Sequence, residues 1–227
     1  MPRGLFITFE GSEGCGKSTQ AQRLAARLEL EGHPFILTRE PGGTAIGEKI
    51  RHLLQFASEG AAMYPETEVL LFEASRSQLV REIIQPALTR GDLVISDRFF
   101  DSTTVYQGAA RKLDAEAVAQ LNRFAVGQCV PDITFILDVE VATARARMMR
   151  RVRPIGLADR MEQEPVEFYE RVCAAYRELA AREPKRIRLV DASASPDEIE
   201  TTIWQILTST FGERLALPDI HPARRKV

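Results

Sequence analysis

The sequence predicts a three-layer α/β fold, with a five-stranded parallel sheet between two layers of helices. Five short apolar runs, each bounded by polar or turn residues, lack the alternation of half-exposed strands. Such runs are typical of strands buried on both faces of a parallel sheet. Longer segments with helical spacing separate the runs, which indicates right-handed βαβ crossovers. A glycine-rich segment between the first run and the first helical segment is the third observation.

The strands are short because each apolar run soon meets a polar or turn residue. The third run continues into Ser96 and Asp97. In chain order, the predicted strands are Leu5–Phe9, Phe35–Leu37, Leu93–Ile95, Ile133–Val139 and Ile187–Val190.

The helices are predicted where apolar residues recur at a spacing of about one helical turn. In the first of them, Leu24 and Leu28 are four residues apart and therefore share a face. In chain order, the predicted helices are Lys17–Leu30, Thr44–Phe56, Pro65–Leu88, Ala115–Val126, Val141–Arg151, Glu164–Ala181 and Pro196–Thr210.

The length and charge limit the classes of protein. The chain has 227 residues, and 30 basic against 32 acidic side chains give a net charge of −2. This balance argues against a general nucleic-acid coating protein, which usually carries a large positive excess. We expect one domain over residues 1–210. The basic end with two prolines, residues 211–227, is expected to be a weakly ordered tail.

The cysteines and the hydropathy pattern indicate a soluble, cytoplasmic protein. Cys15, Cys129 and Cys173 are widely spaced and form no CxxC pair or Cys/His cluster. Neither a zinc site nor a disulfide framework is therefore expected, and a reducing compartment is the simpler interpretation. No apolar run reaches the length of about 18 residues that a membrane span needs.

The glycine-rich segment Gly11–Ser18 fits the phosphate-binding pattern G-x-x-x-x-G-K-[ST] and has the strand before it and helix after it that the pattern requires. Its backbone amides can converge on phosphate oxygens, Lys17 can reach the β- and γ-phosphates, and Ser18 can bind magnesium. The alternative is a simple glycine turn. The motif predicts a P-loop NTPase fold and a nucleotide site formed by Gly11, Ser12, Glu13, Gly14, Cys15, Gly16, Lys17, Ser18 and Thr19.

Asp97 and Arg98 directly follow the third predicted strand. In open parallel sheets, ligands bind at the carboxyl ends of strands. Asp97 is therefore the second expected magnesium partner, and Arg98 can clamp a phosphate with two hydrogen bonds. The alternative is a local surface ion pair.

A cluster of five arginines occupies Arg145–Arg153. Phosphoryl transfer needs several cations and the exclusion of water, so this cluster suggests a lid over about residues 145–160. A solvated basic helix face or an RNA contact is the alternative. No guanine-reading N/TKxD motif is present, which weakens a GTPase interpretation.

Taken together, the chain resembles bacterial thymidylate kinases from about Leu5 to about Thr210. The most specific segments are TREPGGT (Thr38–Thr44) and DRFFDSTTVYQG (Asp97–Gly108). The other matching segments are FEGSEGCGKST (Phe9–Thr19), LLFEASRSQ (Leu70–Gln78), PDITFILDV (Pro131–Val139) and DRMEQE (Asp159–Glu164). The resemblance implies phosphorylation of dTMP to dTDP with ATP and magnesium, on the route to dTTP, by a homodimer.

The resemblance also implies residue roles. Arg98 would hold the acceptor phosphate, and Tyr106 would pack by the sugar, where its bulk disfavours a 2′-hydroxyl. Phe72 would stack on thymine and Arg76 would hydrogen-bond it, whereas the alternative from helical spacing alone is a core Phe72 and a surface Arg76. Arg39 and Pro41 would line the monophosphate site, with Ser102 or Thr103, and Gln107, near the base.

The remaining roles concern the cations that assist catalysis and Glu13, which would lie near the acceptor sugar or the metal. Because Gly14 stands where some relatives have a basic residue, the lid arginines would supply the charge, as in the bacterial arrangement. The residues expected to act in catalysis are Lys17, Arg98, Arg147, Arg151, Arg153 and Glu13, and residues 190–193 would pass the adenine ring. Phe99 departs from the Tyr or His that relatives commonly have, so a role needing a polar group there is not expected.

Three other functions share these motifs. A kinase for another nucleoside monophosphate, or for a deoxynucleoside, would differ only in the pocket formed by Phe72, Arg76 and Tyr106. A non-catalytic nucleotide sensor would bind without turnover. An ATPase that uses its arginine cluster on nucleic acid would be stimulated by nucleic acid and would depend steeply on salt.

Overall fold

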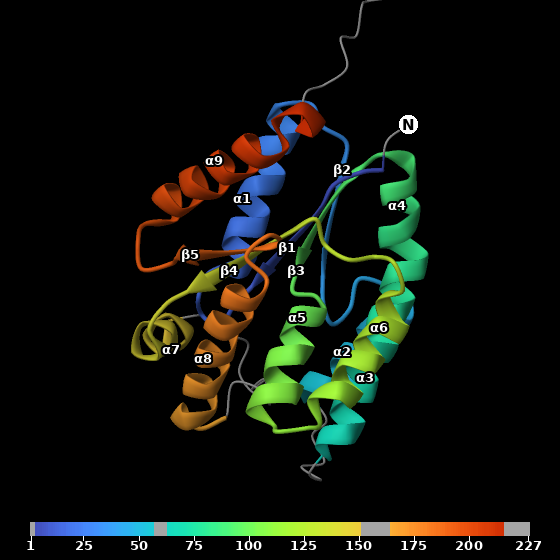
Figure 1. Ribbon diagram of the computed structural model, residues 1–227, viewed down its shortest axis with the longest axis vertical. Coiled ribbons are helices and arrows are strands. Elements are labelled where there is room, and N and C mark those ends of the chain that lie inside the picture. The colour runs from blue at the N-terminus through green and yellow to red at the C-terminus, as the bar shows by residue number, and fades with distance from the viewer. Residues whose placement is uncertain (1–2, 57–62, 151–163, 216–227) are drawn as a thin grey trace, which may run out of the picture.

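The computed structural model describes residues 3–56, 63–150 and 164–215. Its centre is a sheet of five parallel strands in the order β2-β3-β1-β4-β5 (Figure 1). The strands are β1 (Phe6–Glu10), β2 (Phe35–Arg39), β3 (Leu93–Asp97), β4 (Ile133–Asp138) and β5 (Ile187–Asp191). The predicted three-layer α/β fold is therefore confirmed.

One face of the sheet is covered by α1 (Lys17–Leu30) and α9 (Pro196–Leu215). Alternate residues of the central strands, such as Ile7 and Phe9, point to this face, because successive side chains of a strand point to opposite sides. They pack against Leu24 and Leu28 of α1, the pair whose spacing predicted that helix, and against Ile203 of α9. This is the larger apolar core of the described chain.

The opposite face is covered by two groups of helices (Figure 1). Phe6 of β1 and Val94 of β3 meet α3 (Pro65–Leu79), the π-helical turn η1 (Val80–Ile84) and α4 (Gln85–Arg90). Ile136 of β4 meets the π-helical turn η2 (Thr104–Ala110) and α8 (Val166–Arg182). The remaining helices are α2 (Ala45–Phe56), α5 (Phe100–Thr103), α6 (Ala115–Val126) and α7 (Val141–Met149).

Two helical regions differ from the prediction. The single helix expected over 65–88 is α3, η1 and α4 in succession, since a wider π turn interrupts the regular spacing. Residues 100–110, for which no separate helix was expected, form α5 and η2. Together they carry the side chains of Ser102, Thr103, Tyr106 and Gln107 toward the carboxyl edge of the sheet.

The last helix is longer than predicted. Residues 211–215, expected to begin the tail, continue α9, although Phe211 has non-helical dihedrals. Leu215 is buried, and Arg214 donates to Asp132 Oδ1 at 3.0 Å and to the carbonyl oxygen of Gly4 at 3.1 Å. Residues 216–227 lie outside the described chain. No helix within the described ranges has the length and apolarity that crossing a membrane requires.

Candidate active site

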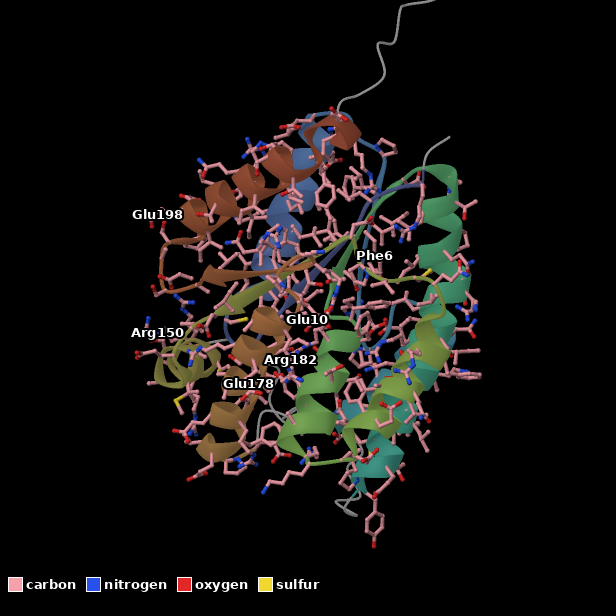
Figure 2. All side chains as sticks on the ribbon, viewed as in Figure 1. Phe6, Glu10, Arg150, Glu178, Arg182 and Glu198 are labelled. Carbon is pink, nitrogen blue, oxygen red and sulfur yellow. The ribbon has the colours of Figure 1, made fainter. Side chains whose placement is uncertain are left out.

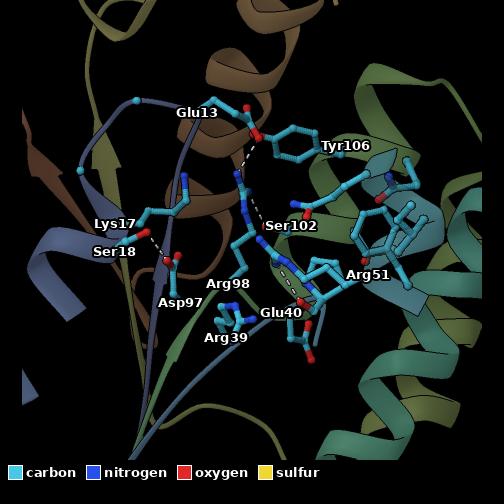
Figure 3. Close-up of a pocket in the computed structure, with 18 residues that line it drawn as sticks. Glu13, Lys17, Ser18, Arg39, Glu40, Arg51, Asp97, Arg98, Ser102 and Tyr106 are labelled. Carbon is cyan, nitrogen blue, oxygen red and sulfur yellow. Dashed lines mark hydrogen bonds and ion pairs between the residues drawn. The ribbon is translucent and has the colours of Figure 1, made fainter. Parts of the chain in front are cut away.

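A cavity of about 230 Å³ opens at the carboxyl edge of the sheet, beside the ends of β1, β2 and β3. Figure 3 shows Lys17 and Ser18 on one side of it, Arg39, Glu40 and Arg51 on another, and Arg98 between them. Its walls are formed by Glu13, Gly14, Gly16, Lys17, Ser18, Arg39, Glu40, Pro41, Arg51, Leu54, Gln55, Phe72, Asp97, Arg98, Ser102, Thr103, Tyr106 and Gln107.

The loop between β1 and α1 forms the wall at Lys17. The Nζ atom of Lys17 donates to the carbonyl oxygens of Gly11 at 2.9 Å and Ser12 at 2.7 Å. The loop enters α1 through Gly16, whose φ of 106° lies in the left-handed region that favours glycine. The free amides at the N-terminus of α1 and the Lys17 ammonium together make this wall suited to anions.

Ser18 and Asp97 are brought together as predicted, because Ser18 Oγ donates to Asp97 Oδ2. The other carboxylate oxygen, Asp97 Oδ1, is buried and has no hydrogen-bond partner among the described residues. A hydroxyl and a carboxylate are hard oxygen ligands, and magnesium usually takes one or two such protein ligands besides phosphates and water. The pair therefore fits a magnesium ion, and the orphaned oxygen is an available ligand.

Arg98 extends across the cavity from the turn after β3. Its backbone has φ 74°, which is uncommon for a residue with a Cβ, and its amide donates to the carbonyl oxygen of Phe9 at 2.9 Å. Nη2 donates to Glu13 Oε1 at 2.6 Å, and Nη1 donates to Ser102 Oγ at 3.1 Å. The guanidinium also lies 5.2 Å from the centre of the Tyr106 ring. These contacts fix its direction.

Glu13 joins Arg98 to Tyr106. Its Oε2 accepts the Tyr106 hydroxyl at 2.7 Å, while Oε1 accepts Arg98. Burial alone would raise the pKa of Glu13, but the positive charges of Arg98 and Lys17 outweigh burial and lower it. The residue is therefore ionised at neutral pH. Burial is also the main reason that the pKa of Tyr106 is raised well above its ordinary value, so its hydroxyl keeps its proton.

The loop after β2 forms another wall. Arg39 Nη2 lies 3.0 Å from both carboxylate oxygens of Glu48, and Pro41 accepts a hydrogen bond from Arg51 Nη1 at 2.9 Å. Between them, Glu40 is buried and lines the cavity. Burial is the largest influence on Glu40, and Arg76 only partly opposes it, so the pKa is raised to about 7.

The cavity wall also contains apolar side chains. Phe72 of α3 and Leu54 of the neighbouring helix α2 line it, together with the polar side chains of Thr103 and Gln107. Gln107 is held in place because its Nε2 donates to the buried Glu68 at 2.7 Å. A flat apolar ring beside an amide and a hydroxyl is suited to a heterocyclic base.

Arg76 lies behind this wall and does not line the cavity. It is 1% exposed and forms ion pairs with Glu40, at 2.7 Å from Oε2, and with Glu73. Its remaining hydrogen bonds go to Thr103 Oγ1 at 2.9 Å, Asn122 Oδ1 at 3.4 Å and the Phe99 carbonyl oxygen at 3.3 Å. All five N–H groups are therefore engaged within the protein. In this arrangement no N–H group of Arg76 is available for the expected hydrogen bond to a base.

Two predicted groups of residues lie elsewhere. Arg147 is not part of the cavity wall, and its Nη1 donates to the carbonyl oxygen of Ala192 at 2.9 Å. Arg151 and Arg153 lie outside the described residues, with most of the proposed lid. Gly11, Ser12, Cys15 and Thr19 belong to the loop and α1 but do not line the cavity.

Phe99 has a structural place. Its ring is fully buried and packs edge-on against Phe6, with the ring centres 4.9 Å apart. It belongs to the apolar core and does not line the cavity, so an apolar ring fits there and no polar group is required.

Four residues of the wall were not predicted from the sequence: Glu40, Arg51, Leu54 and Gln55. Glu40 stands between two predicted site residues in TREPGGT, so its position in the motif was an available signal. The other three belong to α2, whose approach to the cavity depends on how it packs against α3. Nothing in the local sequence of α2 indicates that packing.

The family model described as thymidylate kinase matches residues 9–203. A thymidylate kinase of Afipia carboxidovorans is 47% identical over 94% of this chain and 91% of its own. One from Geobacter sulfurreducens is 44% identical over 93% of this chain and its full length. A crystal structure of thymidylate kinase from Ehrlichia chaffeensis has a TM-score of 0.72 and 34% identity, and covers 91% of this chain and 99% of that one.

Proposed function

Because the chain belongs to the thymidylate kinase family and is a dTMP kinase that forms dTDP, we propose that both nucleotides react in the cavity around Arg98. The observation that carries the proposal is the order of groups along its walls. Figure 3 shows Lys17 on one side, Arg98 in the middle and Arg51 of α2 on the other. Phe72 of α3, the helix that packs against α2, and Gln107, which donates to Glu68 of α3, line the same cavity. This order matches a donor phosphate chain, an acceptor phosphate and a base.

We place the donor, ATP, on the loop Gly11–Thr19. The amides at the start of α1 and the Lys17 ammonium supply positive charge to the β- and γ-phosphates. In the structure Lys17 donates to the loop carbonyl oxygens of Gly11 and Ser12. Exchanging these carbonyl partners for phosphate oxygens would give the lysine a charged acceptor in place of a neutral one, which strengthens its hydrogen bonds.

Ser18 and Asp97 are the proposed magnesium ligands, with Asp97 Oδ1 as the available carboxylate oxygen. A bound magnesium ion would neutralise phosphate charge as it develops. The two residues come from different elements, since Ser18 lies in α1 and Asp97 ends β3. The sheet therefore fixes their separation before any ligand binds.

The acceptor phosphate is assigned to Arg98, with Arg39 on the wall beside the end of β2. A phosphate oxygen of dTMP is already ionised at neutral pH, so its attack on the γ-phosphorus needs little help from a general base. Arg147, Arg151 and Arg153 are the proposed additional cations for the transferred group. Arg147 would leave the Ala192 carbonyl oxygen to act there.

The base is assigned to Phe72, Thr103 and Gln107, and the sugar to Tyr106 with Pro41 beside the phosphate. Ser102 contacts Arg98 directly, which supports a place near the phosphate rather than the base. For Arg76 we propose an indirect part, because it holds Thr103 and Glu40, which do line the cavity. Glu13 connects the sugar region to Arg98.

We further propose a homodimer formed through α2, α3 and α6. These neighbouring helices each expose large apolar side chains, namely Ile46 and Leu53 of α2, Leu70 of α3 and Phe124 of α6, which is 84% exposed. Covering them by a second copy would remove an unusually apolar surface from water.

A cytoplasmic location is supported by Cys15, Cys129 and Cys173, which are all free thiols. Residues 1–210 are proposed as one domain.

The test is a measurement of ADP release with ATP, magnesium and a panel of monophosphates: dTMP, dUMP, dCMP, dGMP and dAMP. We expect dTMP to be preferred, and another preferred acceptor would contradict the assignment of Phe72, Thr103 and Gln107 to thymine.

Arg98→Ala should lower turnover at least about 100-fold while ATP binding persists, because a cation that contacts the reacting groups contributes several kcal/mol. Loss of ATP binding in a folded variant would contradict the assigned role. Stimulation by nucleic acid without an acceptor would favour an ATPase.

A further inference from the structure

Glu10 is a buried carboxylate outside the cavity wall that accepts four hydrogen bonds. It ends β1 (Figure 2) and is fully buried. Its Oε1 accepts the backbone amides of Phe99 at 2.7 Å and Ser102 at 3.2 Å. Its Oε2 accepts the hydroxyls of Ser102 at 2.6 Å and Tyr176 at 2.8 Å. Such complete pairing offsets much of the cost of burying a carboxylate.

These contacts converge on the turn that carries Arg98. We propose that Glu10, Ser102 and Tyr176 form a positioning network that aims the Arg98 guanidinium at the acceptor phosphate. The proposal rests on the assigned role of Arg98. None of the three network residues is required to transfer a proton or to touch the reacting phosphorus.

The first step concerns the direction of the Ser102 proton. Burial and Asp101 raise the pKa of Glu10, whereas Ser102, Arg98 and the Phe99 amide oppose this and favour the carboxylate. A serine hydroxyl has one proton to donate, and a carboxylate can only accept. The short contact of 2.6 Å therefore commits the Ser102 proton to Glu10. The hydroxyl must then present a lone pair to Arg98 Nη1, which lies 3.1 Å away. Glu10 thus turns Ser102 into an obligatory acceptor for the guanidinium.

The second step concerns the backbone of Arg98. Its φ of 74° costs free energy for a residue with a side chain, so surrounding contacts must hold it. The Arg98 amide is bound by the Phe9 carbonyl oxygen, and the next amide, that of Phe99, is bound by Glu10. Both partners lie at the end of β1. The central strand therefore fixes the turn on which the arginine stands.

The third step is a comparison of the two sides of the guanidinium. On one side Nη2 meets Glu13, which accepts the Tyr106 hydroxyl. On the other side Nη1 meets Ser102, which is joined to Glu10 and the Tyr176 hydroxyl, and it also lies 3.5 Å from the Gly11 carbonyl oxygen. Among the described residues, Nε and the second Nη2 proton of Arg98 have no hydrogen-bond partner. The guanidinium is thus held at both ends while N–H groups stay available for an anion.

Tyr176 is the most specific place to test this network, because it is buried in α8 and not part of the cavity wall. Tyr176→Phe removes one hydroxyl and keeps the ring. Glu10→Gln keeps the shape, but its amide can donate to Ser102, which removes the constraint on the Ser102 proton. Tyr169→Phe, on the same helix, is the matched control for losing a buried tyrosine hydroxyl.

The experiment compares dTMP with thymidine, which lacks the phosphate. For each variant we would measure the Kd of dTMP, the Kd of thymidine and the KM of ATP, with thermal unfolding as the check of folding. In Tyr176→Phe we expect the Kd of dTMP to rise about 5- to 30-fold. A hydrogen bond to a charged group contributes about 10- to 150-fold, and the effect here is smaller because Tyr176 acts on Arg98 through Glu10 and Ser102. The Kd of thymidine and the KM of ATP should stay within about twofold.

Two results would overturn the proposal. If the dTMP and thymidine constants rise together, the network only shapes the pocket. If neither moves in Tyr176→Phe or in Glu10→Gln, the network does not aim Arg98. Measuring Arg98→Lys and the wild-type enzyme in the same assay distinguishes a failure of the positioning network from a failure of the proposed function. A wild type that does not use dTMP, or an Arg98→Lys variant with unchanged phosphate selectivity, would contradict the role of Arg98 itself.

Discussion

At the scale of single residues, the cavity is backed by a cluster of buried charges. Arg76 lies between Glu40 and Glu73, and all three side chains are shielded from solvent. One oxygen of each carboxylate, Glu40 Oε1 and Glu73 Oε2, has no hydrogen-bond partner among the described residues. Burial without full pairing favours the protonated acid, and burial is the main reason that the pKa of each carboxyl is raised.

The pKa of about 7 at Glu40 leads to a prediction about stability. Because this pKa is raised above its unfolded value, the folded state binds more protons than the unfolded state between the two. The contribution to stability is complete below about pH 4.5 and is lost as pH rises through about 7. This contribution of Glu40 to the free energy of unfolding is on the order of 3 kcal/mol.

Glu40→Gln removes this titration while keeping an amide in place of the neutral acid. The free energy of unfolding, measured by urea denaturation from pH 4.5 to 8, should fall less steeply with pH in the variant than in the wild type. Glu48→Gln, at an exposed carboxylate nearby, is the control and should leave the wild-type slope in place. Parallel pH profiles for Glu40→Gln and the wild type would contradict the raised pKa.

At the scale of elements, the phosphate-binding loop packs directly against α7. A Cβ on Gly14 would overlap the carbonyl oxygen of Ala144 in α7, whereas a Cβ on Gly16 would have open space around it. Both glycines have positive φ, 78° and 106°, so both substitutions by alanine strain the backbone. Only the first also forces the loop and the helix apart.

These two glycines therefore make a matched pair. Gly16→Ala should lower the free energy of unfolding by about 1–3 kcal/mol through backbone strain alone. Gly14→Ala should cost at least about 1 kcal/mol more, because the clash is with backbone and not with a flexible side chain. Thermal unfolding of both variants checks the order. Equal losses would show that α7 moves freely away from the loop.

The sequence was a good guide to elements whose signals are local. The predicted helix Lys17–Leu30 has the same bounds in the structure, and each predicted strand lies within two residues of the observed one. The π turns η1 and η2 were not expected, since a π turn is stabilised by packing and leaves no regular spacing in the sequence. The phosphate-binding loop, Ser18 with Asp97, and Arg98 were predicted to share a site, and the structure brings them together.

Residues whose contacts depend on packing were harder to predict. The sequence placed Arg76 on a helical face with Phe72, but only the packed structure shows that Glu40, Glu73 and Thr103 surround it. Glu10 was overlooked because a single acid at the end of a strand gives no sign of four distant hydrogen-bond donors. One of these donors, Tyr176, is 166 residues away in the chain.

At the scale of the whole molecule, the exposed apolar residues of α2, α3 and α6 lead to a prediction about the oligomeric state. Phe124→Glu places a charge in the proposed interface and should convert a dimer into a monomer, as measured by sedimentation velocity. Leu30→Glu is the control, because Leu30 is similarly exposed, at 89%, but ends α1 on the other face of the sheet. If both variants have the mass of the wild type, or if both are monomers, the proposed surface is wrong.

The strand order also has a consequence for how the chain is synthesised. β1 is the first strand to leave the ribosome, yet it takes the central position, and its neighbours β3 and β4 begin only at Leu93 and Ile133. Until residue 138 has been translated, at least one edge of β1 has no partner, although all five of its residues are buried in the folded protein. The segment that binds phosphate is thus among the earliest made and among the last to be held in place, and the nascent chain depends on protection of that edge during this interval.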